Sequence, residues 1–595
     1  MMDPVRLLEE ALSATLREVL NVEVVQPDVE LQATHSEFAG DYTLVVFPWV
    51  KQARCKPEVL AEEIGQRIAK RTDLVGGYNV VKGFLNLSVA DAAWREALVA
   101  IPTDGSYGRK ASNSSGRTMV VEFSSPNTNK PQHLGHVRNN LLGNSISEIL
   151  KAVGDTVYKA NLINDRGIHI CKSMVAWLRF GNGATPESTG KKGDHLVGDY
   201  YVKFDKEYKK EIEGLRAKGR SQEEAEAEAP ILREAQEMLR KWEAGDEEVR
   251  ALWKRMNGWV YDGFSATYKT MGISFDKIYY ESQTYLLGKE IVQRGLQEGV
   301  FYRRPDGSVW INLEKDGLDE KLLLRQDGTS VYMTQDLGTA IKRQEEFGAD
   351  IMMYVVGNEQ EYHFQVLKLI LSKLGYAWAD GIYHLSYGMV SLPEGKMKSR
   401  EGTVVDADDL MESLFSIARE TADTLGKLSE LSDEEKETTY RQVGLAALKY
   451  MILKIDPKRN IMFDPKESID FNGNTGPFLQ YTHARACSVL SRLGEGDSGS
   501  PIANAPLSDY ERTLIRRLTQ FPATVESAAK AYSPALIANY LYELAREFNQ
   551  FYHEQPIARE QDGALRQLRS MITQTVRSVL ASGMALLGID APERM

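Results

Sequence analysis

The sequence has few cysteines and no long apolar run, and both shortages exclude classes of protein. Its 595 residues include only Cys55, Cys171 and Cys487, which lie far apart without a Cys-x-x-Cys pair. Neither a disulfide framework nor a thiolate zinc site is indicated, so the cytoplasm is the expected compartment. No apolar stretch approaches the roughly 18 residues that a membrane span requires, so we expect a soluble protein without a membrane partner.

Basic charge is also scarce. The chain has 72 Lys and Arg against 84 Asp and Glu, a net charge of −12. Indiscriminate binding to nucleic acid needs a basic surface, so a protein that coats nucleic acid is excluded, while a local basic groove stays open. The N-terminus MMDPVRLLEEALSATLREVL is acidic and amphipathic, unlike the basic start and apolar stretch of a signal peptide.

The length predicts several domains, since single cores usually stop growing at about 250–300 residues. Residues 1–112 alternate helical and strand-like runs and predict a small α+β domain, which ends in a Ser- and Gly-rich linker. Residues 113–414 predict an α/β domain with a charged, exposed helical insertion at about 190–260. Residues 415–595 show helical apolar spacing almost throughout and predict an all-α domain.

Two histidines stand at the start of a predicted helix. The strand TMVVEFSS precedes SPNTNKPQHLGHVRNN, and VYKANLIND follows as a second strand, which predicts a βαβ crossover and a parallel sheet. The helix N-terminus suits an anion; His133 and His136 add donors, and Gly135 lets a flat base approach the backbone. We therefore predict a nucleotide triphosphate site, with a metal site or two surface histidines as alternatives; no further zinc ligand is evident nearby.

SPNxxKP followed by HxGH resembles the first signature of class I aminoacyl-tRNA synthetases, and its flanks are similar to those of the arginyl-tRNA synthetase family. Residues 385–405 resemble the second, lysine-bearing signature, although KMKSR stands where KMSKS is usual. Lys396, Lys398 or both could therefore take the lysine roles. NTGPFLQYTHARACSVLSR and YLYELAREFNQFYHE resemble the family's helical anticodon-binding domain, and KGFLNLSV its N-terminal tRNA-contacting domain.

The resemblance implies a multidomain α/β protein with a Rossmann-like parallel-sheet catalytic domain between the other two. It implies a monomeric arginine–tRNA ligase that uses ATP with Mg²⁺ and no protein-bound structural metal. L-Arginine would be activated to arginyl-adenylate and transferred to the terminal adenosine of arginine tRNA, with tRNA needed for activation. The implied catalytic residues are Lys130, His133, His136, Lys396 and Lys398. The implied ATP-binding residues are His133, Gly135, His136, Met389 and Val390.

The substrate's planar guanidinium needs carboxylate and amide oxygens. Tyr332 and Asp336 are four residues apart and would share one side of a helix. The resemblance implies an arginine pocket of Glu122, Asn127, Tyr332, Asp336 and Gln360. It also leads us to predict tRNA contacts at Tyr481, Arg485, Tyr540, Arg546 and Tyr552, although aromatic residues of this kind also form the cores of helical bundles.

Three other classes stay open. A nucleotidyltransferase for small phosphorylated molecules shares HxGH but is normally far shorter and lacks the C-terminal domain. A catalytically silent tRNA-binding relative should have a broken histidine pair, and both histidines are present. A class I synthetase for another amino acid is the nearest rival; Tyr332, Asp336 and Gln360 argue against it. His169, His363 and His483 are left without a role.

Overall fold

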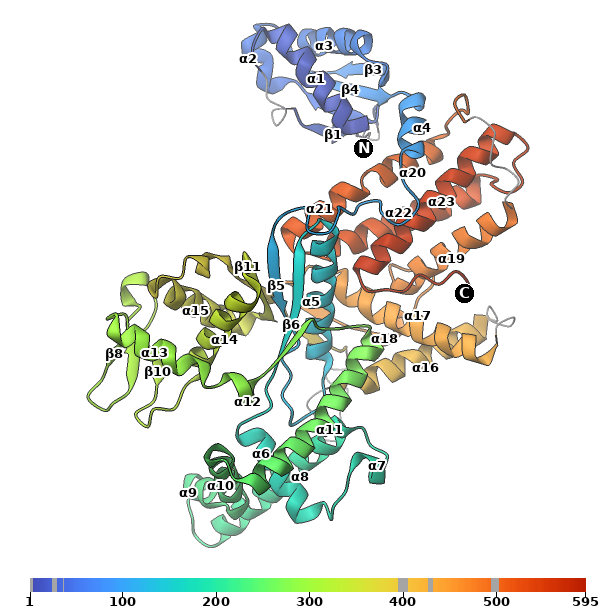
Figure 1. Cartoon of the computed structure of the whole chain (residues 1–595). Helices are drawn as coiled ribbons and strands as arrows, with labels where there is room; N and C mark the ends of the chain where they lie inside the picture. Colours follow the sequence, from blue (N-terminus) through green and yellow to red (C-terminus); the bar gives the residue numbers. More distant parts are fainter. Residues whose placement is uncertain (1–3, 24–28, 36, 394–404, 426–431, 494–501) are drawn as a thin grey trace.

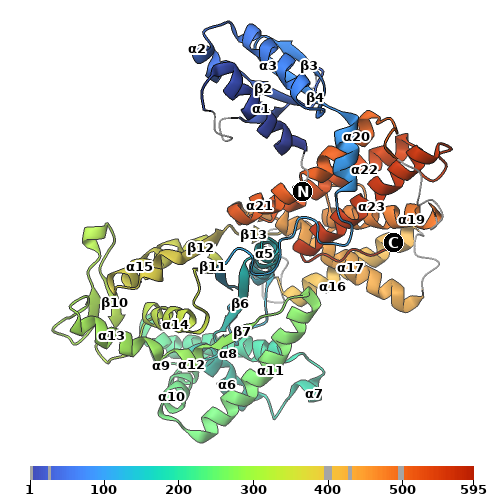
Figure 2. The same ribbon diagram turned by 45° about the horizontal axis from the view of Figure 1, so that its top comes forward.

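The computed structural model describes residues 4–23, 29–35, 37–393, 405–425, 432–493 and 502–595 (Figure 1). The N-terminal domain and the helices inserted in the central domain lie at opposite ends of the molecule, as Figure 2 also shows. Within the described residues, no helix is both long enough and apolar enough to cross a membrane.

The N-terminal domain packs helices on an antiparallel sheet of order β1-β2-β4-β3. Leu8, Leu12 and Leu16 recur every four residues on the first helix and are fully buried, which is the helical spacing of a core face. A short helix then leads to the C-terminal domain, against which it packs. The elements are α1 (Pro4–Leu20), β1 (Leu31–Ala33), β2 (Tyr42–Val45), α2 (Val50–Ala53), α3 (Pro57–Arg71), β3 (Val75–Val81), β4 (Phe84–Val89) and α4 (Asp91–Val99).

The central domain is built on a five-stranded parallel sheet of order β12-β11-β5-β6-β7. Its strands are β5 (Thr118–Glu122), β6 (Thr156–Ile163), β7 (Lys277–Tyr280), β11 (Ile351–Gly357) and β12 (Ile382–Tyr387). The chain runs outward from β5 through β6 to β7 and later returns to the other side of β5. The strand order therefore reverses between β5 and β11, and in open α/β sheets ligands bind beyond the carboxyl ends of strands at such a point.

Alternate residues of β5 belong to different cores. Met119 and Val121 pack with Val137 of α5 (Leu134–Ala152) on one face of the sheet, and Val120 packs with Leu337 of α14 (Tyr332–Phe347) on the other. This alternation follows from the two-residue period of a strand. It explains why TMVVE is apolar without interruption, as strands covered on both faces are. The predicted βαβ unit and parallel sheet are confirmed.

Two insertions interrupt the sheet. The first lies between β6 and β7 and is helical, as predicted for residues 190–260: α6 (Ile168–Phe180), α7 (Pro186–Thr189), α8 (Gly193–Ala217), α9 (Gln222–Glu228), α10 (Pro230–Ala244) and α11 (Glu247–Met271). The second precedes α14 and contains an antiparallel sheet that we did not predict, because its strands are only two to four residues long. Its elements are α12 (Glu281–Thr284), α13 (Leu287–Gln297), β8 (Tyr302–Arg303), β9 (Val309–Ile311) and β10 (Lys321–Leu324).

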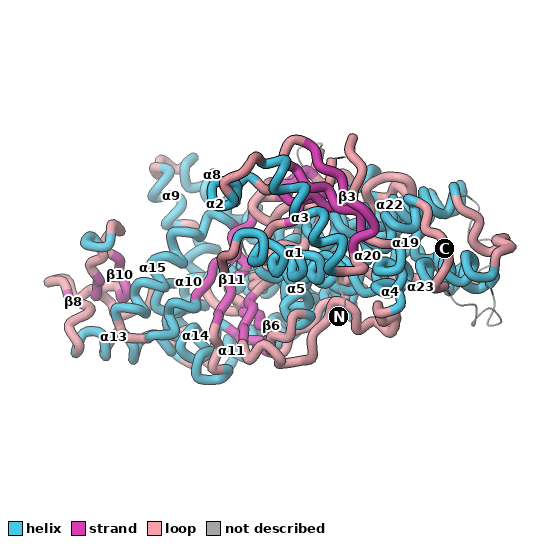
Figure 3. Tube along the Cα trace, turned by 90° about the horizontal axis from the view of Figure 1, so that it is seen from above, coloured by secondary structure: helices cyan, strands magenta, loops and turns pink. Residues whose placement is uncertain are grey.

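The C-terminal part is almost entirely helical (Figure 3). After α15 (Glu361–Lys373) and β12, the short strand β13 (Val390–Ser391) pairs in parallel with β14 (Ile461–Met462). The first long helices pack on α5, and so does α21, which joins this part to the sheet. Its helices are α16 (Ala407–Leu425), α17 (Asp433–Leu453), α18 (Pro465–Ser468), α19 (Gly476–Leu493), α20 (Asp509–Thr519), α21 (Phe521–Ala531), α22 (Ala535–Glu554) and α23 (Gly563–Leu586).

Candidate active site

The two signature histidines cap the N-terminus of α5. His133 is the N-cap residue, and its Nδ1 accepts a hydrogen bond from the Gly135 N–H at 3.1 Å. His136 Nδ1 accepts in turn from the His133 N–H at 3.2 Å, and the ring centroids are 3.9 Å apart. A neutral imidazole whose Nδ1 accepts must carry its hydrogen on Nε2. Both histidines therefore keep an Nε2–H donor for a ligand.

Burial keeps both histidines neutral. It lowers the pKa of His133 to about 4, assisted by the charge of Lys130. The pKa of His136 lies well below its usual 6.5 because of burial, His133 and Lys130. Burial also lowers the pKa of Lys130. Two neutral donors, a nearby lysine and the positive end of a helix are chemically suited to an anion such as phosphate.

Gly135 between the histidines has a packing role. A Cβ at this position would lie 3.0 Å from Cε1 of His133, which is tighter than ordinary van der Waals contact. The missing side chain therefore leaves room for the capping imidazole. This contact is an addition to the role that we predicted for Gly135, which was to let a base approach the backbone.

The loop between β5 and α5 is held in a strained conformation. Ser124 and Ser125 have φ values of +79° and +46°, in the left-handed region that costs non-glycine residues about 1–3 kcal/mol. Asn139 of α5 stabilises this turn: its Oδ1 accepts from the Ser124 N–H at 2.5 Å, and its Nδ2 donates to the Val355 carbonyl at 2.6 Å. One amide thus ties the loop, α5 and β11 together where the strand order reverses.

A cavity of about 710 Å³ opens beside this loop. Asn127 and Tyr332, two of the predicted arginine-binding residues, line it. Tyr332 is the first residue of α14 and is 76% exposed, so its ring is available to a ligand. Asp336 follows one turn later and pairs with Nε2 of His363 at 2.6 Å. Gln360 ends an exposed 3₁₀ turn after β11.

The predicted pocket residue Glu122 is buried against an internal arginine. Its carboxylate forms an ion pair with Arg343, whose side chain is 1% exposed. The Arg343 guanidinium lies over the rings of Tyr279 and Tyr354, at 4.9 and 5.6 Å from their centroids. Arg343 is the residue that our sequence analysis missed here. Arg343 lies seven residues after Asp336 on α14, and this spacing places both near the same helix face. The spacing could have indicated that Arg343 lies near the predicted pocket.

Two more carboxylates beside the cavity were missed. Glu281 lines the cavity, and burial raises its pKa to about 7, with Arg166 opposing and Asp165 and Asp336 assisting. Asp165 follows β6 and accepts hydrogen bonds from the Ser282 N–H at 2.8 Å and from its Oγ at 2.7 Å. Both residues follow neighbouring parallel strands, whose carboxyl ends share one edge of the sheet, and that placement could have indicated them. The cavity lining also includes Arg166, Lys289 and Arg325, so it offers groups of both charges to a ligand.

The residues that flank the second signature lie beside the histidines. The Leu134 N–H donates to the Val405 carbonyl at 2.9 Å, and the Ala407 N–H donates to the Gln132 carbonyl at 2.9 Å. Met389 is exposed between β12 and β13, and the half-buried Val390 begins β13. The predicted lysines, Lys396 and Lys398, lie outside the described residues.

Three of the predicted tRNA-binding residues gather on α19 and α22. Arg485 lies 4.8 Å from the ring centroid of Tyr481 and 5.1 Å from that of Tyr552. Arg546 is exposed and pairs with Glu543 at 2.6 Å.

The prediction that Tyr540 contacts tRNA is wrong. It is buried, its hydroxyl donates to the Arg517 carbonyl at 2.8 Å, and its ring packs near Phe521. Burial in the helical core removes Tyr540 from any tRNA-facing surface.

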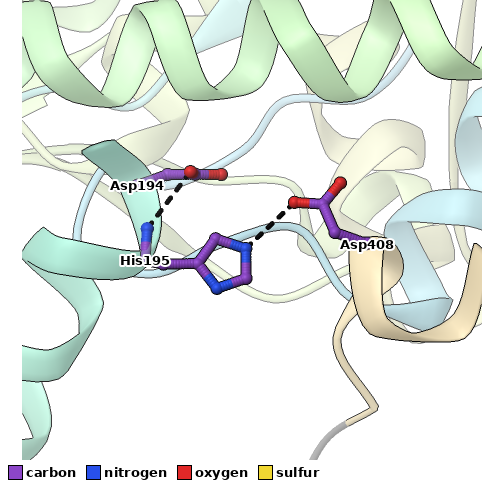
Figure 4. Close-up of side chains that lie close together, drawn as sticks. All are labelled: Asp194, His195 and Asp408. Carbon is purple, nitrogen blue, oxygen red and sulfur yellow. Dashed lines mark hydrogen bonds and ion pairs between the residues drawn. The ribbon is translucent and has the colours of Figure 1, made fainter. Parts of the chain in front are cut away.

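A separate charged cluster joins α8 to the start of α16 (Figure 4). His195 Nε2 lies 2.9 Å from Asp408 Oδ2, and the fully buried Asp194 accepts from the His195 N–H at 3.1 Å. The Lys192 ammonium lies 2.5 Å from Asp408 and 3.2 Å from Asp194. Because this ammonium already supplies the cation, we assign the cluster a structural role; the prediction that no metal is bound stays a prediction.

Replacing Asp408 by asparagine should destabilise the protein more at pH 6 than at pH 9. Although burial opposes both charges, the carboxylates raise the pKa of His195 above 6.5, and His195 and Lys192 hold that of Asp408 at about 2. A raised histidine pKa stabilises the fold below pH 6.5 and loses its effect as pH rises through the folded-state value. A lowered aspartate pKa stabilises above about pH 4 and loses its effect as pH falls towards 2.

Melting temperatures at the two pH values measure the difference, which should correspond to about 1 kcal/mol. The exposed neighbour Asp409 provides the control, since Asp409→Asn removes the same charge outside the cluster. An equal loss of stability for Asp408→Asn at pH 6 and pH 9 would contradict the titration of His195 against this carboxylate.

A parallel sheet with a histidine-capped helix at its switch point, insertions between its strands and a helical C-terminal part defines a class I aminoacyl-tRNA synthetase. Residues 99–464 match the family "tRNA synthetases class I (R), catalytic domain". Residues 479–595 match the DALR anticodon binding domain, and residues 6–89 match the arginyl tRNA synthetase N terminal domain. The chain belongs to the arginyl-tRNA synthetase family. The domain boundaries that we predicted stay predictions.

Relatives match over essentially the whole chain. An arginine–tRNA ligase of Parabacteroides distasonis is 56% identical over 589 residues, covering 98% of each chain. One of Flavobacterium psychrophilum is 52% identical over 602 residues, covering 99% of this chain and all of its own. The solved arginyl-tRNA synthetase of Thermus thermophilus is 28% identical with a TM-score of 0.77, and the match covers 99% of this chain and all of that one.

Proposed function

We propose that the chain is an arginine–tRNA ligase in which the α5 histidines bind the phosphates of ATP and the cavity beside α14 binds arginine. The enzyme forms arginyl-adenylate and pyrophosphate, and then transfers arginine to the 3′-terminal adenosine of its tRNA. The residue-level proposal rests on one observation: the two neutral histidine donors at the start of α5 lie at the same edge of the sheet as a cavity lined by Asn127, Glu281 and Tyr332.

In the first step, the carboxylate of arginine attacks the α-phosphorus of ATP in line and expels pyrophosphate. The nucleophile is already ionised, so no general base is required and catalysis consists of positioning and of stabilising phosphate charge. His133 and His136 donate through Nε2–H to the triphosphate. Lys130 adds positive charge there, as would Lys396 and Lys398. ATP would enter as its magnesium complex, and the ion would help to neutralise the phosphate charge.

Arginine is recognised through its guanidinium. We assign the guanidinium to Asp336, whose side chain is 35% exposed beside His363, because Glu122 is already compensated by Arg343. Asn127 and Tyr332 of the cavity lining, together with Gln360, would complete the surroundings. The neutral analogue citrulline would leave a carboxylate partly unpaired, at a cost of about 1–3 kcal/mol or more. This difference supports selection without an editing domain.

The tRNA would bind through the helical C-terminal domain and the N-terminal domain. Arg485 with the rings of Tyr481 and Tyr552 offers cationic and aromatic surface for unstacked bases, and Arg546 offers an exposed guanidinium. Such local surface is compatible with the net charge of −12. By class, the acceptor is the 2′-hydroxyl of the terminal adenosine. We also propose a cytoplasmic monomer.

Pyrophosphate exchange with each of the twenty amino acids, with and without total tRNA, tests this function. We expect exchange with arginine alone and only in the presence of tRNA. Exchange with a different amino acid would retain the fold and the phosphate site but overturn the assignment of the pocket. No exchange under either condition would favour a catalytically silent tRNA-binding protein.

A further inference from the structure

Arg138 lies on α5 and is fully buried, with 0% of its side chain exposed. Among the described residues, its guanidinium donates four hydrogen bonds, and all four go to main-chain carbonyl oxygens. Nη1 donates to Gly388 at 2.7 Å and to Met389 at 2.9 Å, and Nη2 donates to Pro457 at 2.9 Å and to Arg459 at 2.7 Å. In the described part of the chain, no carboxylate forms an ion pair with it.

A buried guanidinium without a counter-charge is unfavourable, because it loses its hydration. Burial lowers the pKa of Arg138 to about 10, which still leaves it charged at neutral pH. Four carbonyl dipoles compensate the charge. Only a planar fork with two separate Nη groups reaches both pairs of acceptors; the compact ammonium of lysine offers three hydrogens from one point. The position therefore requires the geometry of arginine as well as its charge.

The two pairs of acceptors belong to two segments that form one unit, residues 388–391 and 457–463. β13 and β14 pair in parallel within this unit. Further main-chain hydrogen bonds join the segments: Gly388 N–H to Pro457 O at 3.0 Å, Ile461 N–H to Met389 O at 2.8 Å, and Phe463 N–H to Ser391 O at 2.8 Å. Arg138 attaches this unit to the helix that begins with the histidine pair.

We propose that Arg138 is a positioning residue for adenylate formation, which holds segment 388–391 at a fixed distance from His133 and His136. This inference rests on the proposed function, because the segment contains Met389 and Val390, two of the residues predicted to bind ATP. The histidines and the nucleotide-binding segment come from distant parts of the chain, and Arg138 bonds directly from one to the other. A displacement of about 1 Å in such a site costs about 100-fold in rate.

The variant Arg138→Lys tests this role. We expect kcat/KM for ATP in pyrophosphate exchange to fall about 100-fold, while KM for arginine stays within about twofold. Arg569→Lys is the matched control: Arg569 of α23 is also buried, but it pairs with Glu511 and Glu560, each at 2.8 Å, in the C-terminal domain. This control should lower the melting temperature and leave the kinetic constants for ATP unchanged.

Gly388→Ala provides a second, independent test that leaves Arg138 in place. A Cβ at Gly388 would lie 2.7 Å from the backbone of Arg459, so it would force apart the two segments that the guanidinium joins. We expect the same selective loss in kcat/KM for ATP. If Arg138→Lys fails to fold, Gly388→Ala still tests whether the position of segment 388–391 controls the use of ATP.

Wild-type kinetic constants for ATP in both variants, whatever their melting temperatures, would overturn the inference and leave Arg138 with a role in stability alone. An equal loss for ATP and arginine would also overturn it. The wild-type protein separates this result from the proposed function, since absence of arginine-dependent exchange in the wild type would refute the function itself.

Discussion

Replacing Asp336 by asparagine should raise KM for arginine by about 100-fold while KM for ATP changes little. The carboxylate lies one turn after Tyr332 on α14 and is 35% exposed in its side chain. Removing one partner of a charge-assisted hydrogen-bonded pair costs about 2–5 kcal/mol, and partial exposure places this site at the lower end. Pyrophosphate exchange, measured first at varied arginine concentration and then at varied ATP concentration, gives the two KM values separately.

Glu345→Gln is the matched control for Asp336→Asn. Glu345 is an exposed acidic residue on the same helix, and its replacement removes one negative charge without touching the cavity. It should leave both KM values at the wild-type level. If Asp336→Asn weakened arginine and ATP use equally, the assignment of Asp336 to the arginine pocket would be lost.

Replacing His136 by alanine should lower kcat for pyrophosphate exchange by about 100- to 1,000-fold, the usual cost of removing one donor to developing charge. The same loss is expected at pH 6.5 and pH 8.5. The pKa of His136 lies well below 6.5 and that of His133 is about 4, so neither ring changes its charge in this range. Exchange kinetics at the two pH values, with circular dichroism to verify folding, provide the measurement.

His136→Gln should recover part of the lost activity. A glutamine at this third helical position can accept from the His133 N–H, as in a capping box, and still donate through its side-chain amide. Equal activity of the alanine and glutamine variants would show that restoring the cap does not restore catalysis, and that the donor must be an imidazole. A loss that appears only at the lower pH would point to a protonated imidazole and would contradict the neutral donor pair.

The central fold could be predicted because its signals are local. The two-residue period of β5 and the helical period of α5 lie within one stretch of sequence, and a strand, a helix and a strand in succession leave little choice of topology. The charged insertion was equally visible, because alternating charge with few apolar residues leaves little to bury. The prediction of donors at a helix N-terminus followed from the place of His133 between strand and helix, whereas its role as the N-cap of α5 was not predicted.

Buried charges could not be predicted in this way. Arginine is usually exposed, so residue type alone places Arg138 and Arg343 at the surface. Their partners lie on distant segments that meet only in the folded chain. Tyr540 shows the converse: an aromatic residue on a helix has the same pattern whether it faces tRNA or a neighbouring helix. Its burial depends on how α22 packs against α21, which no local signal specifies.

The order of the sheet strands has a consequence for synthesis of the chain. β5 ends at Glu122, yet its neighbour on one side, β11, begins only at Ile351. The nascent chain must therefore carry β5 with one edge unpaired while both insertions emerge. Unpaired edges and long-range parallel pairing slow folding and promote aggregation. Completion of the site at that edge therefore waits on late synthesis, and the protein should rely on chaperones until β11 has left the ribosome.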